Sequence, residues 1–408
     1  MRDSSLALLT KGYAWLPDRR RRSGFAPVRT RLLGKPAIVL HGPEAVPFFY
    51  DEAHVLRRSA LPEPVIDTLF GRGAVHTLDG EQHRARKALF VSLLKDRARV
   101  ASLARHAEEE WEGAQSEWAG REEVVLFDEM SKVLTRAVCS WAGLPGDIGR
   151  DDALADDLVA MVDGFATAGP RHWRARRARH RQEDRLGRLI STYRSPEALE
   201  GVPDGSVLTS VASHRDEDGA LLHVRTAAVE LLNVVRPTVA VSWFLTFGAH
   251  AMHRWPSVRE RLAAGDASYA LAFAQEVRRF YPFAPFLGGL AAADLRWQGE
   301  EIPAGTMVLL DVYGQNHDPE LWEAPYVFSP ERFVGREPGR DELIPQGGGE
   351  AGSGHRCPGE DITLALLCAL GPKLARLTYD VPEQDLRIPL RRVPTRPRSG
   401  FVMSGVQA

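Results

Sequence analysis

Hydrophobic side chains recur at three- to four-residue spacing along much of this chain, and polar side chains fill the positions between them. This is the period of a helix that buries one face, so the pattern predicts a largely helical protein. Other segments have the composition and turns of short strands. The predicted helices cover residues 43–51, 80–94, 98–118, 126–142, 152–168, 174–193 and 266–281, and the predicted strands cover 30–40, 291–297 and 306–312. We therefore expect a mainly α fold with small β-sheets, of the α+β class.

Two stretches depart from simple periodicity. Residues 62–79 show few periodic signals and are predicted to form a long loop, and long loops inside compact domains are usually functional. Residues 171–185 hold seven arginines at helical spacing. Charges in that arrangement cover most of a helix surface, so we predict a solvated face. The alternative is a basic rim that attracts anionic substrates toward a channel mouth.

The segment from 221 to 250 is apolar nearly all round, which predicts a helix in the middle of a large core. Arg236 and Pro237 interrupt this segment. Proline inside a helix kinks it and costs about 3 kcal/mol, and a buried arginine must face an anion because it stays charged. Two unfavourable residues side by side in a core helix indicate a function. A structural carboxylate that pairs with Arg236 is the other explanation.

Composition narrows the class of protein. The chain has 408 residues, 44% of them hydrophobic, with a net charge of -2. Its length would allow two or three domains, but no repeat or low-complexity linker divides it, so we expect one domain over residues 1–408. Balanced charge gives no indication of a nucleic-acid partner or an anionic membrane surface.

The cysteines and the first residues bear on the compartment. Cys139, Cys357 and Cys368 are an odd, sparse set, which argues against a disulfide framework and for a reducing compartment. Residues 1–16 contain charged side chains and no long apolar span, so we expect neither a signal peptide nor a membrane anchor. These features predict a soluble cytoplasmic protein.

A glycine-crowded stretch at residues 347–360 contains Cys357 and runs directly into an apolar helical segment. Repeated glycines indicate a backbone that approaches another group closely and takes φ values that other residues avoid. The N-terminus of the following helix would stabilise a thiolate at Cys357. A thiolate at the end of such a loop suits an axial haem ligand, and thiolate ligation favours O–O cleavage. The alternative is a buried structural cysteine beside a tight turn.

Three charged residues suggest an ion-pair network. Glu276 and Arg279 lie on one face of a predicted helix with Asp266 as its N-cap. Such a pair is usually a surface salt bridge that contributes little. Arg332, further along the chain in a Pro-Glu-Arg-Phe motif, would convert it into a buried three-member network.

Along the chain, the Glu276–Arg279 pair comes first, the Pro-Glu-Arg-Phe motif second and the glycine loop with Cys357 third. This ordered set of motifs resembles the cytochrome P-450 superfamily, and the resemblance covers essentially the whole chain. It implies a haem b cofactor (iron protoporphyrin IX) buried between the long central helix and the helix after the cysteine loop. Cys357 would be the axial ligand of the haem iron, and the Glu-Arg-Arg set would brace the haem-binding core. By position, the partners of the haem propionates would be His83, with Arg86 or Lys87, and His355.

Two departures from the common pattern indicate one branch of that superfamily. Ordinary monooxygenase members carry an acid–alcohol pair in the central helix, and residues 233–238 contain no acid. The phenylalanine usual near the start of the cysteine loop is also missing, and Gln346 stands there. Both features, with the segment 273–286, are similar to the fatty-acid peroxygenases. In that branch the arginine of the Arg-Pro pair, here Arg236 with Pro237, binds the substrate carboxylate, and hydrogen peroxide is the oxidant.

The resemblance implies a reaction near the carboxyl end of a fatty acid. A carboxylate held by Arg236 through a charge-assisted pair would replace the missing acid in proton transfer. The products would be a terminal alkene plus carbon dioxide, an α- or β-hydroxy fatty acid, or both. No obligatory redox partner is expected. Two other functions stay open: a conventional monooxygenase fed by ferredoxin or flavoprotein partners, and a haem-binding sensor without catalysis.

The segment 70–80 is similar to that of alkene-forming members, which carry histidine where hydroxylating relatives often have glutamine. His76 would donate a proton or order water at the reaction centre, and Phe70 would pack beside it. The alternative is a hydrogen-bonded loop histidine without a catalytic effect. Four further side chains are candidates for an apolar substrate channel, although each would also suit a core: Phe165, Phe283, Phe286 and Leu287.

Overall fold

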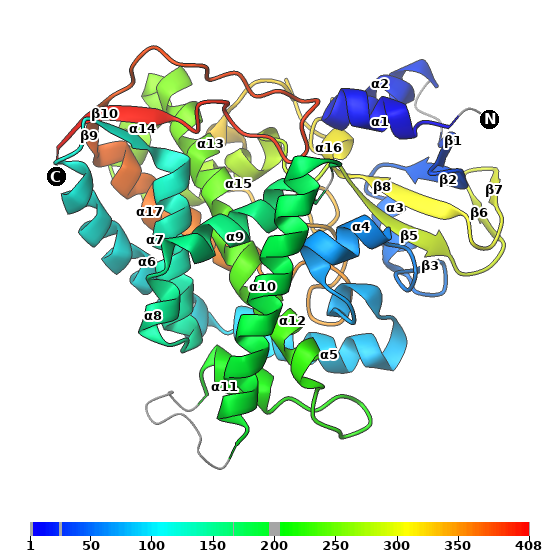
Figure 1. Cartoon of the computed structure of the whole chain (residues 1–408). Helices are drawn as coiled ribbons and strands as arrows, with labels where there is room; N and C mark the ends of the chain where they lie inside the picture. Colours follow the sequence, from blue (N-terminus) through cyan, green and yellow to red (C-terminus); the bar gives the residue numbers. More distant parts are fainter. Residues whose placement is uncertain (1–2, 24–26, 166, 196–204, 408) are drawn as a thin grey trace.

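Helices make up most of the protein, and a five-stranded sheet lies at one side of them (Figure 1). The computed structural model describes residues 3–23, 27–165, 167–195 and 205–407. The predicted mainly α fold with small sheets is confirmed. The larger helices are α5 (Gly80–Leu94), α6 (Arg97–Trp118), α7 (Leu126–Ala142), α9 (Asp152–Asp163), α10 (Pro170–Tyr193), α12 (Val224–Val239), α13 (Val241–Arg254), α15 (Ala267–Phe280) and α17 (Glu360–Arg376).

The five-stranded sheet has the order β1-β2-β8-β5-β3, and β2 pairs with β8 in parallel while the other pairs are antiparallel. The elements of this part are α1 (Ser5–Lys11), η1 (Gly12–Ala14), α2 (Trp15–Arg22), β1 (Val28–Leu32), β2 (Lys35–Leu40), α3 (Ala45–Tyr50), β3 (Val55–Leu56), β5 (Phe286–Ala291), β8 (Met307–Asp311) and α16 (Val312–Gln315). Side chains alternate between the two faces, as the strand period requires. Leu309 packs in a cluster with Trp15 of α2, whereas Leu310 packs in a cluster with Phe49 of α3.

The remaining elements are short. Strands β4, β10 and β9 form a three-stranded sheet in that order, and β6 pairs with β7. These elements are α4 (Glu63–Val65), η2 (Ile66–Phe70), η3 (Val75–Thr77), β4 (Glu123–Val125), α8 (Gly146–Gly149), α11 (Val207–Ala212), α14 (Pro256–Ala263), β6 (Leu295–Trp297), β7 (Glu300–Ile302), η4 (Pro330–Phe333), β9 (Thr378–Asp380) and β10 (Val402–Gln407).

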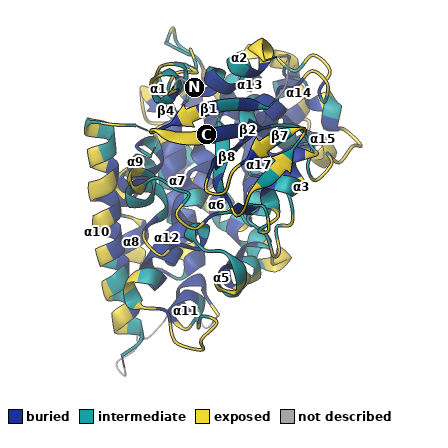
Figure 2. Ribbon diagram, turned by 90° about the vertical axis from the view of Figure 1, so that its right-hand side faces the viewer, coloured by how far each residue is buried: buried dark blue, intermediate teal, exposed yellow. Residues whose placement is uncertain are grey.

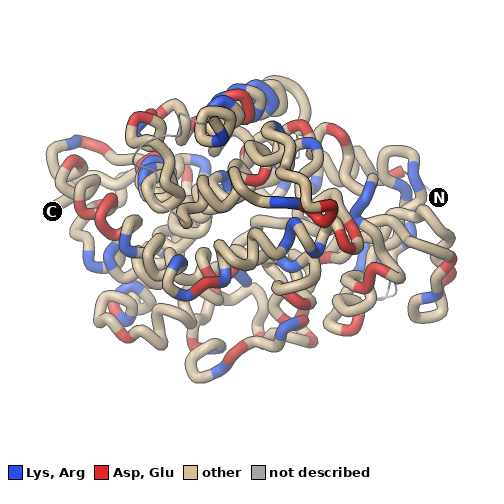
Figure 3. The backbone as a smooth tube through the Cα atoms, turned by 90° about the horizontal axis from the view of Figure 1, so that it is seen from below, with Lys and Arg blue, Asp and Glu red and all other residues tan. Residues whose placement is uncertain are grey.

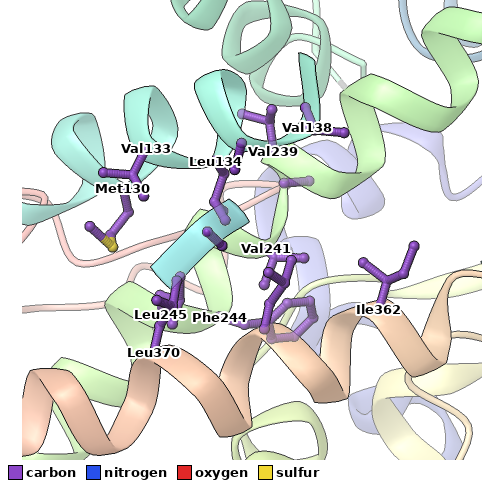
Figure 4. Packing of buried hydrophobic residues seen from close by; sticks show 14 of the residues in the cluster. Met130, Val133, Leu134, Val138, Val239, Val241, Phe244, Leu245, Ile362 and Leu370 are labelled. Atoms are coloured by element: carbon purple, nitrogen blue, oxygen red, sulfur yellow. The ribbon is translucent and has the colours of Figure 1, made fainter. Parts of the chain in front are cut away.

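Helices α12 and α13 follow each other through the middle of the protein and meet at Ala240. The stretch Val224–Arg254 is long and apolar enough to cross a membrane, yet 94% of its most apolar window is buried inside the protein. Figure 4 shows the packing: α7 lies on one side and α17 on the other, with Leu134, Phe244 and Ile362 among the side chains between them. The stretch is therefore the core helix that its composition predicted.

Three local predictions are wrong. The helix predicted at 152–168 is shorter, because α9 ends at Asp163 before Gly164. Residues 62–79 are not a plain loop, because they form the helical turns α4, η2 and η3. Turns this short carry no readable period, so only their tertiary contacts define them. The strand predicted at 291–297 is also misplaced, since β5 ends at Ala291 and β6 begins at Leu295. Helix α7, by contrast, ends at Ala142 as predicted, where Gly143 takes a left-handed φ of 75°.

Candidate active site

The candidate site lies where α12 passes the loop that precedes α17. Helix α12 supplies Arg236, and the loop supplies Cys357. The two side chains are close enough to interact electrostatically, because the Cys357 sulfur raises the pKa of Arg236 against a larger decrease caused by desolvation. The residues predicted from two distant parts of the sequence thus meet in one region of the protein.

Cys357 lies in the loop just ahead of α17, whose N-cap is Gly359. Its backbone amide donates to the Gln346 carbonyl at 3.2 Å, and the side-chain amide of Gln346 lies 3.8 Å from the sulfur. Desolvation raises the pKa of the thiol, and the Gly359 amide and Lys87 offset only part of that rise. The helix N-terminus alone therefore does not hold a thiolate here. A coordinated metal ion would, because a coordinating thiol loses its proton outright.

The glycine loop before Cys357 is pressed against α3. Gly347 and Gly349 have φ values of 91° and 71°, which confirms the predicted left-handed backbone. A Cβ atom at Gly347 would lie 2.3 Å from the hydroxyl oxygen of Tyr50, and the Gly348 amide donates to that oxygen at 3.1 Å. Only glycine allows this approach, so α3 determines where the loop that carries the sulfur runs.

A cluster of buried nitrogen donors lies beside this loop. The rings of His83 and His355 stack with centroids 3.8 Å apart, and the charge of Arg57 affects both. His83 Nδ1, His355 Nε2 and one terminal nitrogen of Arg57 are buried and lack a hydrogen bond, although carboxylate oxygens of Glu52 and Asp79 lie 3.6–3.9 Å from the two imidazoles. Buried donors without a hydrogen bond are costly, and nitrogen atoms gathered in this way can bind an acidic group. The two propionate groups of haem are acidic groups of this kind.

Lys87 joins the same cluster. Its ammonium group donates to the Arg356 carbonyl at 2.6 Å, next to Cys357, and desolvation lowers its pKa to about 8. The sulfur ligand, the glycine approach and these donors are therefore the parts that a thiolate-bound haem needs. Of the residues predicted to hold haem, the structure brings together His83, Lys87, His355 and Cys357, with Arg57 beside them; these would hold it.

Arg86 is a correction to the predicted haem contacts. Its guanidinium donates to both carboxylate oxygens of Asp216 and to Glu230 at 2.9 Å. Successive residues of a helix point about 100° apart, so Arg86 faces α12 while Lys87 faces the cysteine loop. With the Gly73 carbonyl, four of its five N–H donors have partners on this side, away from the cysteine loop. The sequence left open whether Arg86 or Lys87 would contact a haem propionate, and the structure favours Lys87.

The predicted three-member ion network is present. Glu276 accepts two hydrogen bonds of 2.7 Å from Arg279, and Arg332 Nε lies 3.1 Å from the same carboxylate. Glu276 and Arg279 are almost completely buried. Arg279 also donates to the carbonyls of Asn316 and Pro325 at 2.8 and 2.9 Å. The network ties α15 to the loop before η4.

Arg236 is a buried cation with little to hold it. It is 5% exposed, its terminal nitrogen donates to Asn233 Oδ1 at 3.3 Å, and its Nε has no partner. No carboxylate pairs with it among the residues that the structure describes. Desolvation, and to a smaller extent the nearby Arg179, lower its pKa to about 9. The structural-carboxylate explanation of Arg236 is therefore excluded for the described part of the chain.

Pro237 follows Arg236 inside α12, and the helix continues to Val239. Proline has no amide hydrogen, so the carbonyl of residue 233 loses its helical partner. The Thr238 hydroxyl donates to the next carbonyl along, that of Val234, at 3.0 Å, and so does not replace the lost partner. The predicted irregularity therefore lies beside the Arg236 side chain.

Phe70 and His76 lie together, as predicted, with ring centroids 4.3 Å apart. Desolvation, followed by the charges of Arg236 and Lys87, holds the pKa of His76 well below its usual value of 6.5. His76 Nδ1 is buried and has no hydrogen-bond partner. The imidazole is therefore neutral, lies near Arg236, and makes no hydrogen bond through Nδ1.

The four predicted channel residues divide into groups. Leu287 lies next to the glycine loop, 3.6 Å from a Cβ placed on Gly347, and the Phe283 ring lies 5.0 Å from the Phe244 ring of α13. Phe286 points to the opposite face of β5 and packs against Trp15.

Alternation along β5 thus places Phe286 in the cluster of the N-terminal helices, so its predicted place in a channel is not supported. Phe165 is half-buried in the turn between α9 and α10. Leu287 and Phe283 remain the channel candidates that lie nearest to the helices and loop of the site.

The arginine-rich segment forms α10, whose outer side is exposed (Figure 2). Several of its arginines pair with acids, including Arg181 with Asp157 and Arg185 with Asp151, and Figure 3 shows basic and acidic residues interspersed along the chain. The predicted solvated face is thus correct for most of the segment. Arg179 is the exception, because it is 2% exposed and points inward.

Sequence reasoning missed several residues of the site. Arg57, Asn233 and Glu230 are buried polar side chains that the predictions did not assign, and Arg179 was hidden in a run of solvated arginines. One signal was readable: Glu230, Asn233 and Arg236 are spaced by three within an otherwise apolar helix. That spacing puts them on one face.

Comparison with known proteins agrees with this geometry. The cytochrome P450 family profile matches residues 265–392. The solved structure of cytochrome P450SP alpha (CYP152B1) in complex with (R)-ibuprophen is 41% identical, covers 99% of each chain and superposes with a TM-score of 0.95. Ligand-free cytochrome P450 OleT is 38% identical, covers 100% of this chain and 98% of its own, with a TM-score of 0.95.

A third solved structure, cytochrome P450EX alpha (CYP152N1) with myristic acid, is 36% identical over 99% of this chain and 97% of its own, with a TM-score of 0.93. Among curated proteins, a putative cytochrome P450 137 of Mycobacterium tuberculosis is 29% identical over 237 residues, which are 55% of this chain and 48% of that protein. The chain thus spans about half the length of the curated relatives it matches. Identity near 40% over the full length of the solved structures shows that this chain belongs to the cytochrome P450 family, in its CYP152 branch of fatty-acid peroxygenases.

Proposed function

We propose that this protein is a hydrogen-peroxide-dependent haem-thiolate peroxygenase that oxidises fatty acids near the carboxyl end. The products would be a terminal alkene with carbon dioxide, an α- or β-hydroxy fatty acid, or both. One observation carries the proposal: the buried guanidinium of Arg236 lacks a carboxylate partner in the described structure and lies near Cys357 and His76. A fatty-acid carboxylate is an anion that would complete this centre.

The nature of the relatives supports a long-chain acid as the substrate. A single-residue variant of cytochrome P450 OleT was solved in complex with arachidonic acid, and cytochrome P450EX alpha was solved with myristic acid. Both ligands combine one carboxylate with a long apolar chain. In this protein we assign the carboxylate to Arg236 and the apolar chain to the side of Phe70, Phe283 and Leu287.

A thiolate-ligated haem, once bound, would supply the oxidising chemistry by promoting cleavage of the peroxide O–O bond. The protein side chains would supply the rest. Arg236 would hold the substrate carboxylate by a charge-assisted pair, so that this carboxylate takes over the proton transfer for which residues 233–238 have no acid; Glu230, one turn earlier on α12, is paired with Arg86. It would also hold the first carbons of the chain in one place. His76, being neutral, would donate a hydrogen bond from one ring nitrogen and accept one at the other.

We further propose that the chain acts as one catalytic domain and needs no redox partner. Peroxide already carries the two electrons that a monooxygenase receives from a ferredoxin or flavoprotein. An acid supplied by the substrate, rather than by the central helix, fits this mode of reaction. We expect the enzyme to work in the cytoplasm on free fatty acids.

The test is incubation of the purified, haem-loaded protein with hydrogen peroxide and a series of saturated fatty acids, with product identification by mass spectrometry. We expect alkene or hydroxy acid from the free acids. The methyl esters of the same acids are the control: they have the same chain but no charge for Arg236, and should give no product. Turnover of acids only with a reductase and NAD(P)H would overturn the proposal in favour of a conventional monooxygenase. A shift of the haem absorption band without any product would favour a sensor.

A further inference from the structure

One face of α12 carries three buried polar residues among apolar ones: Glu230, Asn233 and Arg236. Their spacing of three places them in a row along the helix. The last of them is the proposed substrate anchor. The first two contact a different part of the chain, the segment 69–76, which carries Phe70 and His76.

Glu230 and Asn233 bind both ends of this segment. The Asn233 side-chain amide donates to the Phe70 carbonyl at 2.9 Å, and the Val75 amide donates to Glu230 at 2.8 Å. Asn233 also links the other two residues of this row. Its side-chain nitrogen donates to Glu230 at 3.2 Å, and its side-chain oxygen accepts from Arg236 at 3.3 Å. One asparagine therefore touches both the substrate anchor and the backbone at Phe70.

Arg179 of α10 also binds the backbone at Phe70. Its two terminal nitrogens donate to the carbonyls of Leu69 and Phe70 at 2.6 and 2.7 Å, and its Nε donates to Glu183 at 2.7 Å. The Phe70 carbonyl thus accepts from two buried side chains. An arginine in this position is costly to bury, and only Glu183 forms an ion pair with it in the described chain.

Gly71 makes room for this contact. It has a φ of 86°, and a Cβ atom there would lie 2.2 Å from an Arg179 terminal nitrogen and 2.8 Å from a methyl carbon of Val229. A residue with a side chain would be strained at this φ and would push Arg179 off the carbonyls. The contact of Arg179 with the segment 69–76 therefore requires glycine at position 71.

We propose that Arg179 and Asn233 are positioning residues that set the place of Phe70 and His76 relative to Arg236, and thereby which carbon of the bound acid reacts. This inference rests on the proposed function. Arg236 fixes the carboxylate, so the α and β carbons occupy neighbouring positions along one short stretch of chain. A displacement of about 1 Å at such a centre is enough to change the outcome of a reaction. Arg179 and Asn233 act on the ratio of products through the segment they hold.

The test compares Arg179→Gln, Arg179→Lys and Asn233→Leu with the wild type in the peroxide reaction on one saturated acid. We expect Arg179→Gln and Asn233→Leu to change the ratio of alkene to α- and β-hydroxy acid by about threefold or more, as for residues coupled in one network. Arg179→Lys keeps the charge and one donor and should lie between Gln and wild type. Arg177→Gln is the matched control, because Arg177 is exposed on the same helix and should leave the ratio unchanged.

A purely structural role predicts a different result. It would lower the unfolding midpoint and slow all products alike, so an unchanged ratio in folded, haem-loaded Arg179→Gln and Asn233→Leu would overturn the inference. Should Arg179→Gln not fold, Asn233→Leu and Gly71→Ala test the same contact from its other two sides. Failure of the proposed function is seen separately, because the wild type itself would then give no product from acid and peroxide.

Discussion

Replacing Arg236 by methionine is expected to make the protein more stable and to remove its response to fatty acids. Methionine fills a similar volume without a charge. In the described structure the guanidinium has one hydrogen bond, to Asn233 at 3.3 Å, and no carboxylate partner. If Arg236 serves binding and not folding, its replacement should raise stability and lower activity at the same time.

The magnitude follows from the cost of the unpaired charge. The pKa of Arg236 falls from the ordinary 12.5 to about 9, which corresponds to roughly 5 kcal/mol. The folded value lies below the unfolded one, so folding disfavours the cation. This penalty is fully present below about pH 9 and disappears as the pH rises toward 12.5. After relaxation, replacement of buried charges by apolar side chains gives about 1–4 kcal/mol, and we expect Arg236→Met to gain an amount in that range at neutral pH.

The assay is thermal unfolding of the haem-loaded protein at neutral pH, with and without a saturated fatty acid. Without the acid, Arg236→Met should unfold at a higher temperature than the wild type. A ligand at 100 times its Kd stabilises a protein by about 2.7 kcal/mol, so the acid should raise the wild-type midpoint and leave the variant unchanged. Peroxide-driven turnover of the acid should fall in parallel, because a lost desolvated pair with a carboxylate costs about 2–5 kcal/mol.

Arg177→Met is the control for the change of side chain itself. Arg177 is exposed, so its removal should alter neither the midpoint nor the effect of the acid. The reasoning is refuted if Arg236→Met is less stable than the wild type and is still stabilised by the acid. That result would mean that the guanidinium supports the fold and that the carboxylate binds elsewhere.

Three other substitutions test the remaining parts of the site. Cys357→Ala should abolish the carbon monoxide difference band of a thiolate-ligated haem, and a retained band would assign the iron ligand to another residue. His76→Gln should raise hydroxy acid relative to alkene, and an equal ratio would remove any role for the imidazole. Because the pKa of His76 is held well below 6.5, the wild-type ratio should stay flat from about pH 6 to 8; a titration step in it would contradict a neutral ring. Glu276→Gln should lower the free energy of unfolding by about 3–5 kcal/mol in urea titrations, since the buried Arg279 and the half-buried Arg332 lose their counter-ion, and wild-type stability would show that other contacts hold them.

Much of the site was readable because its signals are local. Glycine is the residue that tolerates the left-handed backbone at Gly347 and Gly349, and a charged Arg236 in an apolar helix stands out against its neighbours. Side-chain chemistry of this kind is visible at one position or over one turn of helix. The predicted contact of Phe70 with His76 is also local in sequence.

Other parts depended on which face of an element meets which neighbour. Arg86 and Lys87 are adjacent cations of similar length, and the side of α5 that faces Asp216 and Glu230 decided that Arg86 forms the ion pairs. In the sequence, Arg179 cannot be distinguished from the solvated arginines around it. Only the fold shows that it donates to the Phe70 carbonyl. Phe286 and Leu287 are both apolar, and the alternation of β5 sent them to opposite faces.

The sequence by itself determined the helical class, the core helix with its buried cation, and the loop that presents Cys357, because each follows from residue chemistry over a short window. Only the tertiary structure decided the hydrogen bonds of Arg179 and Asn233 to the segment 69–76, the choice between Arg86 and Lys87, and the place of Arg57 beside His83 and His355. Those groups come from helices and loops far apart in the chain. Their pairing depends on distances that no periodicity encodes, so a buried polar group reveals its partner only once the fold has placed both.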